Sequence, residues 1–452
     1  MTYRTETDSL GVVQIPEYAY YGPQTQRAVE NFRISGLGFP ASFIHTMALI
    51  KQCGAKVNAE LGLIDTYMAS AIQKAAQEVI DARLDAEFVV DVFQTGSGTS
   101  TNMNVNEVIA SRANELLTGL RGGKKPVHPN DHVNLGQSSN DVFPSAMNIT
   151  VLMEISHRLL PGLEHLKETL SQKAIEFQNV PKLGRTHLQD AVPMTLGQEF
   201  SGYARQIELG IRRATSATES LSELALGGTA VGTGLNTHPD FAGRVIRCIS
   251  DITGLTFVEA QNHFEAQSAR DAGVETSGAL KTIAVSLTHI ANDIRWLASG
   301  PRCGIGEIEL PELQPGSSIM PGKINPVIPE VVIQVAAQVI GNDATITLCG
   351  QGGYFQLNTM MPLMVHSLLQ SISLLSRAIA AFSDNCIAGI RPRADVCLHH
   401  IQSSLYIATM LTPFIGYDRA ADIARKAFKS GKTIREIAMS ETDLPEIPWE
   451  RI

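Results

Sequence analysis

The polar stretch from Gly316 to Asn325 reads Gly-Ser-Ser-Ile-Met-Pro-Gly-Lys-Ile-Asn. Glycine and proline surround its polar residues, so we expect a loop rather than part of a helix. Ser317 and Ser318 offer hydroxyl groups, and Lys323 adds a cation a few residues later. Such a loop can place a base and a cation over one small anion. An ordinary surface turn uses the same residue types, so this loop alone leaves both interpretations open.

A second polar segment, residues 94–104, reads Gln-Thr-Gly-Ser-Gly-Thr-Ser-Thr-Asn-Met-Asn and precedes a helical pattern. Its glycines let backbone N–H groups face a ligand, and the hydroxyl groups of Ser97 and Thr99 can donate hydrogen bonds. A helix N-terminus at this point would strengthen an anion site. No Gly-Lys-Ser/Thr follows, which excludes a Walker-type phosphate loop. A turn rich in capping residues is the simpler alternative.

A third segment carries two histidines four residues apart, His128 and His132. That spacing could indicate a metal pair on a helix. Pro129, Asn130 and Asp131 lie between them and indicate a turn, and no third ligand is nearby. We therefore expect no metal site here.

Ser138, Ser139 and Asn140 follow directly and precede a long helical pattern. Short donors at the beginning of a helix can bind a carboxylate together with the free N–H groups of the first turn. Simple capping of the helix by the same residues is the alternative.

The last cluster, residues 184–190, contains Thr186 and His187 and precedes a further helical pattern. A histidine near its ordinary pKa can transfer protons at neutral pH, provided a carboxylate holds its tautomer. Glu330 is a candidate partner, because the rest of its segment is apolar and a carboxylate there needs a paired charge. A hydrogen-bonded structural histidine is the alternative.

The elements that must position these residues are mostly helices. Apolar residues recur every three or four positions through residues 152–177 and 280–297. Helical patterns also cover residues 43–63, 69–84 and 105–117, and Pro161 should kink the first long helix. Residues 327–348 are apolar nearly all round, which predicts a helix at the centre of a bundle. The pattern breaks at residues 386–393, so a small C-terminal part should follow.

Composition limits the possible partners. The 452 residues are 44% hydrophobic, only 6% aromatic and 18% charged, with a net charge of −9. No basic block suits nucleic acid, and no uncharged apolar run is long enough for a membrane span. The 6 cysteines show no framework spacing and no signal-peptide pattern is present, so we expect a cytoplasmic protein with reduced thiols. The low charged fraction favours surface buried against other subunits.

All four clusters, in the same order, resemble the motifs of the fumarase/aspartase superfamily, and the resemblance covers nearly the whole chain. Within it, details lean to the class II fumarases rather than the aspartases. Thr-Gly-Ser-Gly-Thr at 95–99, Ser-Ser-Asn-Asp at 138–141 and Gly-Gly-Thr-Ala at 227–230 are fumarase-like. The segment at 326–332 leans slightly to the aspartases.

The resemblance implies an activity and site residues. The reaction would be the reversible anti hydration of fumarate to (S)-malate, a step of the tricarboxylic acid cycle, through an aci-carboxylate intermediate. Ser317 would be the base, and His187, polarised by Glu330, would transfer the proton of the departing or attacking water. A second group would bind the dicarboxylate substrate: Ser97, Thr99, Ser138, Ser139, Asn140, Thr186, Ser318, Lys323 and Asn325. His128, Pro129, Asn130 and Asp131 match a second anion site, and no metal or other cofactor is implied.

The resemblance also implies a mainly α fold of three domains. Residues 1–138 would form a mostly helical N-terminal domain, residues 139–392 a bundle of long helices, and residues 393–452 a small helical domain. The bundle would form the core of a homotetramer whose active sites take residues from three subunits. Such an assembly would explain why the clusters lie so far apart in sequence.

Two other interpretations remain open. The chain could be an aspartate ammonia-lyase, or it could act on a substituted fumarate. A member of another class, retained as a structural or binding protein, is disfavoured by the intact Ser317, Lys323, Asn325, His187 and Glu330.

Overall fold

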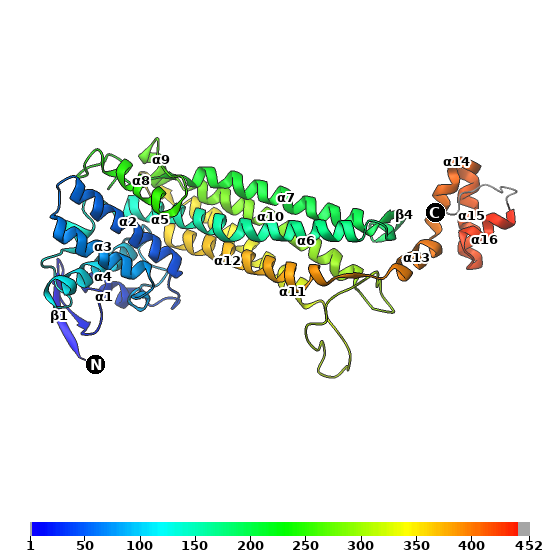
Figure 1. The fold of residues 1–452 in the computed structure, drawn as a ribbon, viewed down its shortest axis with the longest axis horizontal. Coiled ribbons are helices and arrows are strands. Elements are labelled where there is room, and N and C mark those ends of the chain that lie inside the picture. Colours follow the sequence, from blue (N-terminus) through cyan, green and yellow to red (C-terminus); the bar gives the residue numbers. More distant parts are fainter. Residues whose placement is uncertain (1, 442–452) are drawn as a thin grey trace. The chain divides into compact units, whose positions relative to one another are not determined.

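The structure, a computed structural model, describes residues 2–441. It is mainly helical, as predicted, and Figure 1 labels its elements. The chain divides into two compact units. The first comprises residues 1–161, 212–282 and 337–375, and the second comprises residues 162–211, 283–336 and 376–452. Residues 442–452 of the predicted C-terminal domain lie outside the described residues.

The long helices have residues in both units. They are α6 (Leu160–Glu176), α7 (Leu196–Leu221), α10 (Asp271–Leu297), α11 (Val327–Gly350) and α12 (Met361–Asn385). Residues at helical spacing on these helices are buried, including Leu280, Ile283, Leu287, Ile290 and Ile294. The periodicity seen in the sequence is therefore the buried face of each helix.

The first unit contains these shorter elements: β1 (Tyr3–Asp8), β2 (Gly11–Pro16), α1 (Pro23–Asn31), α2 (Ala41–Glu60), α3 (Thr66–Ile80), α4 (Thr99–Thr118), α5 (Ser139–Glu154), β5 (Glu223–Leu224), α8 (Phe241–Thr253), β6 (Val258–Glu259), α9 (His263–Ser268), β8 (Gly353–Tyr354) and β9 (Leu357–Asn358). The pairs β1–β2 and β8–β9 are antiparallel hairpins, and β5 pairs with β6 in parallel. None of these strands was expected from the sequence.

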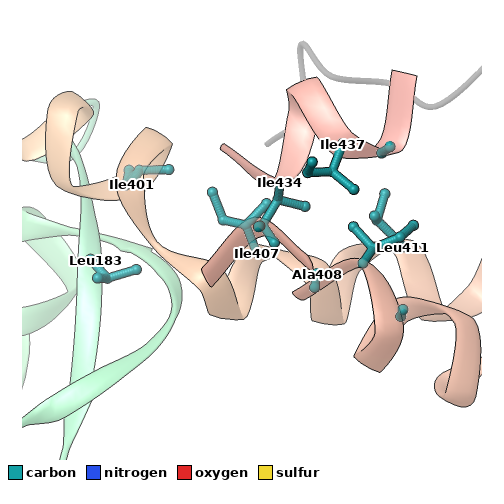
Figure 2. Packing of buried hydrophobic residues seen from close by; sticks show 11 residues of the cluster. Leu183, Ile401, Ile407, Ala408, Leu411, Ile434 and Ile437 are labelled. Atoms are coloured by element: carbon teal, nitrogen blue, oxygen red, sulfur yellow. The ribbon is translucent and has the colours of Figure 1, made fainter. Parts of the chain in front are cut away.

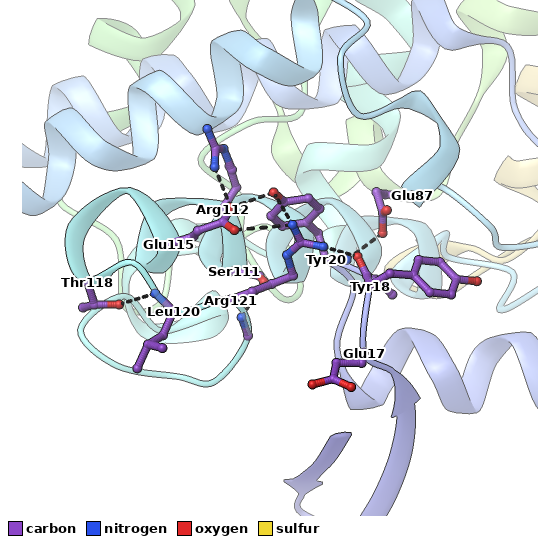
Figure 3. Close-up of polar contacts among 12 residues, drawn as sticks. Glu17, Tyr18, Tyr20, Glu87, Ser111, Arg112, Glu115, Thr118, Leu120 and Arg121 are labelled. Atoms are coloured by element: carbon purple, nitrogen blue, oxygen red, sulfur yellow. Dashed lines mark hydrogen bonds and ion pairs between the residues drawn. The ribbon is translucent and has the colours of Figure 1, made fainter. Parts of the chain in front are cut away.

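Polar contacts hold the N-terminal segment against α4 (Figure 3). The Tyr20 hydroxyl donates to Glu115 at 2.6 Å, and the Arg121 guanidinium lies 3.9 Å from the centre of the Tyr20 ring. Glu107, buried in α4, accepts hydrogen bonds from the backbone N–H groups of Gly22, Gln24 and Thr25 at the beginning of α1. These contacts fix α4, whose N-terminus carries Thr99.

The second unit contains β3 (Pro181–Thr186), β4 (Gln189–Thr195), β7 (Ile308–Glu309), β10 (Arg391–Pro392), α13 (Ala394–Ser403), α14 (Thr412–Ile415), α15 (Tyr417–Ser430) and α16 (Ile434–Glu441). The pairs β3–β4 and β7–β10 are antiparallel. A buried apolar cluster includes Leu183 of β3 together with Ile401, Ile407, Leu411 and Ile437 (Figure 2). The small C-terminal helices thus pack against the hairpin that carries His187.

Two features of helix shape go beyond the sequence-based expectations. The long helix expected around Pro161 continues from α5 into α6 through a π turn at Ile155–Leu159, just before the proline. A wider turn accommodates a proline that has no N–H group to donate to the preceding turn. The second feature concerns α11, which is partly exposed on a single chain, so its expected place at the centre of a bundle completed by other subunits stays a prediction. Val331, Ile340 and Leu348 are 44%, 41% and 61% exposed.

Two helical segments among the described residues, Val327–Gly350 and Met361–Gly389, could cross a membrane by length and composition alone. Each also carries polar groups with partners inside the protein. On α11, Asp343 accepts from Ser277 and Lys281 of α10, and Asn342 donates to Ser371 of α12. Such pairing is typical of core helices in a bundle.

Candidate active site

Two helix N-termini meet in the first unit. Thr99 is the first residue of α4 and Ser139 is the first residue of α5, and their hydroxyl oxygens lie 2.7 Å apart. The Ser97 hydroxyl lies 2.7 Å from that of Thr99. Both helices carry unpaired N–H groups and the positive end of a dipole at this point. The arrangement suits a carboxylate, and it brings Ser97, Thr99 and Ser139 together as the sequence predicts.

The beginning of α5 is also fixed by a capping box. The Ser138 hydroxyl accepts from Asn140 N at 3.2 Å, and Asp141 accepts from Ser138 N at 2.9 Å. The second carboxylate oxygen of Asp141 accepts from Gly227 N and Thr229 N, both at 3.0 Å. Asn140 donates to the backbone oxygen of Ala230 at 2.8 Å. Residues 227–230 are therefore held beside the site. Capping of α5 by Ser138 therefore does not exclude binding of a carboxylate by the same segment.

Two glycines are required for this geometry. A Cβ at Gly96 would lie 1.8 Å from the backbone oxygen of Thr359, and one at Gly98 would lie 2.1 Å from the Phe143 ring. Gly98 also has a positive φ of 74°. The glycines of this segment thus allow close packing that sets the start of α4.

His187 lies at the tip of the β3–β4 hairpin in the second unit. Thr186 pairs with Gln189, so His187 and Leu188 form a two-residue turn, with φ values of 56° and 58°. Asparagine and glycine are usual in such a turn. Non-glycine residues with positive φ are strained and concentrate at functional sites, so the geometry favours a functional role for His187.

A buried ion cluster supports this hairpin. Glu307, whose side chain is fully buried, accepts two hydrogen bonds from Arg185 at 3.1 and 2.8 Å. His400 lies 3.0 Å and Lys182 3.4 Å from the same carboxylate. Burial alone would raise the pKa of Glu307, but the Arg185 guanidinium, Lys182 and His400 lower it overall. The carboxylate therefore stays ionised and holds β3 in place.

The loop from Gly316 to Asn325 is closed by its own backbone. Gly316 N donates to the Lys323 carbonyl at 2.8 Å, and the Asn325 amide donates to the Gly316 carbonyl at 2.7 Å. The Ser317 hydroxyl oxygen accepts from the backbone N–H groups of Ile319 and Met320, at 3.3 and 3.0 Å. Two N–H donors on one hydroxyl oxygen favour its ionised form. Asn325 thus shapes the loop as well as being a candidate ligand.

Glu330 lies in the first turn of α11 and is partly buried. No hydrogen bond or ion pair joins it to His187 within the described part of the chain. The pairing of these two residues remains a prediction.

Comparisons with known proteins decide the family. A lyase family model matches residues 11–341, and a model of the fumarase C C-terminus matches residues 407–452. The chain is 55% identical to a class II fumarate hydratase of Nitrosomonas europaea, covering 97% of this chain and 95% of that protein. It is 50% identical to one of Methylorubrum extorquens, covering 99% and 95%. The structure of a class II fumarase from Schistosoma mansoni superposes with a TM-score of 0.95, at 41% identity, covering 97% and 95%.

The chain belongs to the class II fumarate hydratase family. It is a lyase of the hydro-lyase type, as the motif details at 95–99, 138–141 and 227–230 predicted. Membership in this family disfavours the aspartase interpretation drawn from residues 326–332.

The predicted second anion site of this family member lies at a π turn, Pro129–Val133. His128, Asp131 and His132 line an open pocket of about 800 Å³ together with Lys124 and Lys125. The His128 Nδ1 atom accepts from Asn130 N and Asp131 N, and burial lowers the pKa of the ring. Pro129 is buried and Asn130 does not line the pocket. No group of three or more His, Cys, Asp or Glu residues in the described ranges is arranged to hold a metal ion.

Two residues with well-defined partners were missed in the sequence. Glu307 shows no sequence signal, because it is one of two glutamates, with Glu309, in a short segment that follows several glycines. Lys51 does show one. It falls at helical spacing between Met47, Ala55 and Asn58, all buried on one face of α2. A lysine on a buried face is rare enough to indicate a special role.

Proposed function

We propose that the protein catalyses the reversible hydration of fumarate to (S)-malate in the tricarboxylic acid cycle. Family membership and the names of the relatives support the substrate. The observation that carries the chemistry is the pair of N–H groups directed at the Ser317 hydroxyl oxygen. A serine becomes a usable base only when its alkoxide is stabilised, and these donors supply that stabilisation.

In the direction of dehydration, the Ser317 alkoxide removes the proton from C3 of malate. The electron pair of the C–H bond moves into the neighbouring carboxylate and gives the aci-carboxylate dianion. His187, polarised by Glu330, then gives a proton to the hydroxyl group on C2 as the C–O bond breaks, releasing water and fumarate. Hydration follows the same steps in reverse.

The substrate-binding residues act by holding negative charge. Thr99, Ser139 and Asn140, with Ser97 and Ser138, hold one carboxylate at the two helix N-termini. Thr186, Ser318, Lys323 and Asn325 complete the set. Donors that bind the aci-carboxylate more tightly than malate accelerate the step.

We also propose a cytoplasmic homotetramer. The exposed apolar residues of α11 support subunit contacts, and an assembled site would take its clusters from three subunits. The six cysteines, all free, fit a reducing compartment.

The test is the absorbance of fumarate after addition of (S)-malate, and separately aspartate, to the purified protein. We expect a rise with malate only. Ser317→Ala and His187→Asn should each lower kcat at least about a hundredfold, while Ser430→Ala, on exposed α15, should leave it unchanged. A rise with aspartate alone, or variants as active as the unchanged protein, would contradict the proposal.

A further inference from the structure

Lys51 is fully buried in α2, and the residues around it are amides rather than carboxylates. Its Nζ atom donates to Asn134 Oδ1 at 2.8 Å and to Gln137 Oε1 at 3.0 Å. Burial lowers the pKa of Lys51 to about 7. An ammonium group placed in such surroundings costs free energy, so it persists only where it offsets another charge or serves a function.

The amide of Asn134 connects Lys51 to both helices of the carboxylate site. Its oxygen also accepts from Asn102 at 3.3 Å and from Asn106 at 3.1 Å, both on α4. Its nitrogen donates to the backbone oxygen of Gln137 at 3.1 Å, immediately before the capping residue of α5. Lys51 and these amides therefore lie directly behind the two N-termini where Thr99 and Ser139 meet.

Asp141 is the second buried charge in this region. Burial raises its pKa, while the N–H groups of Ser138, Thr229 and Gly227 and the charge of Lys51 oppose the rise. Both carboxylate oxygens accept N–H donors, which is the pattern of an ionised carboxylate. The charge of Asp141 favours the protonated form of Lys51 and opposes the effect of burial. The two groups that accept hydrogen bonds from Lys51, on Asn134 and Gln137, are neutral amides.

We propose that Lys51 is a positioning residue for substrate binding, whose buried ammonium compensates the Asp141 carboxylate behind the Thr99–Ser139 site. Asp141 is needed to hold residues 227–230 and the beginning of α5. Its negative charge lies in the first turn of α5, beside a helix N-terminus that must accept a substrate carboxylate. Without Lys51, that charge would repel the substrate carboxylate and offset the attraction of the helix N-termini. This inference rests on the proposed function.

The charge of Lys51 should appear in binding rather than in the chemical step. We expect Lys51→Met, which keeps most of the unbranched side chain but removes the ammonium group, to raise KM for (S)-malate about tenfold, or about 1.4 kcal/mol in binding. The value of kcat should change by less than about threefold, since Lys51 touches neither reacting atoms nor substrate. Lys56→Met removes the same charge from an exposed position on the same helix and should leave KM unchanged.

The pH dependence separates charge from packing. Succinate, a dicarboxylate with no double bond to hydrate, is the probe, and its Kd is measured calorimetrically at about pH 6 and about pH 8.5, on either side of the Lys51 pKa. Wild-type Kd should rise with pH as Lys51 loses its proton. Lys51→Met should bind weakly at both values. Comparing the change of Kd with pH in the wild type and in Lys51→Met removes the contribution of other titrating groups.

Lys51→Met with wild-type KM, or the same pH dependence in both proteins, would overturn the proposal. If Lys51→Met does not fold, Lys51→Gln is measured in its place, and a wild-type Kd that does not rise with pH overturns the proposal by itself. Failure of the proposed function is distinguishable, because the wild type would then release no fumarate from malate. Failure of the Lys51 proposal leaves that activity intact.

Discussion

The hydroxyl oxygens of Thr99 and Ser139 lie 2.7 Å apart, although the two residues are 40 positions apart in the sequence. Each is the first residue of its helix, so a carboxylate at this point meets the positive ends of two helices and those first-turn N–H groups that the capping residues leave free. The contact is made within one compact unit.

We therefore expect Thr99→Ala and Ser139→Ala each to raise KM for malate about tenfold, the loss typical of a hydrogen bond to a charged group. The double variant should lose less than the product of the two single effects, because the hydroxyl groups contact each other. Steady-state kinetics of the three proteins check this. Thr150→Ala, in the middle of α5, is the control and should keep wild-type KM. Fully multiplicative losses would show that the two residues act separately.

Glu307 should be important for both stability and catalysis. Glu307→Gln leaves Arg185 and Lys182 buried near a neutral group, and breaking such a cluster costs about 3–5 kcal/mol. Because Arg185 precedes Thr186 and His187, kcat should fall as well. Chemical denaturation and kinetics measure the two effects. Glu312→Gln, at an exposed position, should change neither. A variant with normal stability would contradict the structural role.

The same carboxylate predicts a dependence of stability on pH. The folded-state pKa of Glu307 is lowered, so its contribution is present above the unfolded-state pKa of about 4.3. It is lost as the pH falls through the lower folded-state value. Below about pH 4, the Tm of the wild type should therefore fall more steeply with decreasing pH than the Tm of Glu307→Gln. Parallel curves for the two proteins would contradict the assignment.

The helices could be predicted from the sequence because their signal is local. The spacing of Leu280, Ile283 and Leu287 marks a buried face whatever it packs against. None of the small sheets in the described part of the chain was predicted. Three of them pair strands of only two residues, such as Ile308–Glu309, which carry no periodicity.

The polar parts of the site were only partly predictable. Ser139 and Thr99 lie in motifs with recognisable capping and loop residues. The contact between them depends on packing that no local pattern encodes. The partners of Lys51 and Glu307 come from distant segments. Asn134 lies 83 positions from Lys51, and Arg185 lies 122 positions from Glu307. The exposed face of α11 is apolar, but apolar composition alone does not say what covers it, so its place in a bundle of several subunits stays a prediction.

The thiols of Cys53 on α2 and Cys248 on α8 shift each other's pKa, and this should make Cys248 unusually reactive. The interaction with Cys53 lowers the pKa of Cys248 to about 7, with help from Lys56. The thiolate is the reacting form. At neutral pH, iodoacetamide should modify Cys248 before the buried Cys349 and Cys386, whose pKa values burial raises.

Peptide mass mapping over time gives the order of modification. Cys53→Ala should slow the reaction of Cys248, because the interaction that lowers the pKa of Cys248 is lost, and Cys386→Ala is the control that should not. An unchanged rate in Cys53→Ala would show that Cys53 does not activate the thiol of Cys248.

The apolar side chains on the exposed part of α11 should be subunit contacts. Ile340 and Leu348 are 41% and 61% exposed on a helix whose other side is buried. A large apolar surface of this kind on one chain marks an interface.

Ile340→Glu places a charge in that interface, where it cannot be paired, and should shift a tetramer to smaller species in light scattering. Activity should fall with the assembly, because the proposed site takes residues from three subunits. Leu10→Glu changes an exposed leucine in the β1–β2 turn and should leave both assembly and activity intact. Full activity in a monomeric Ile340→Glu variant would show that one chain suffices for catalysis.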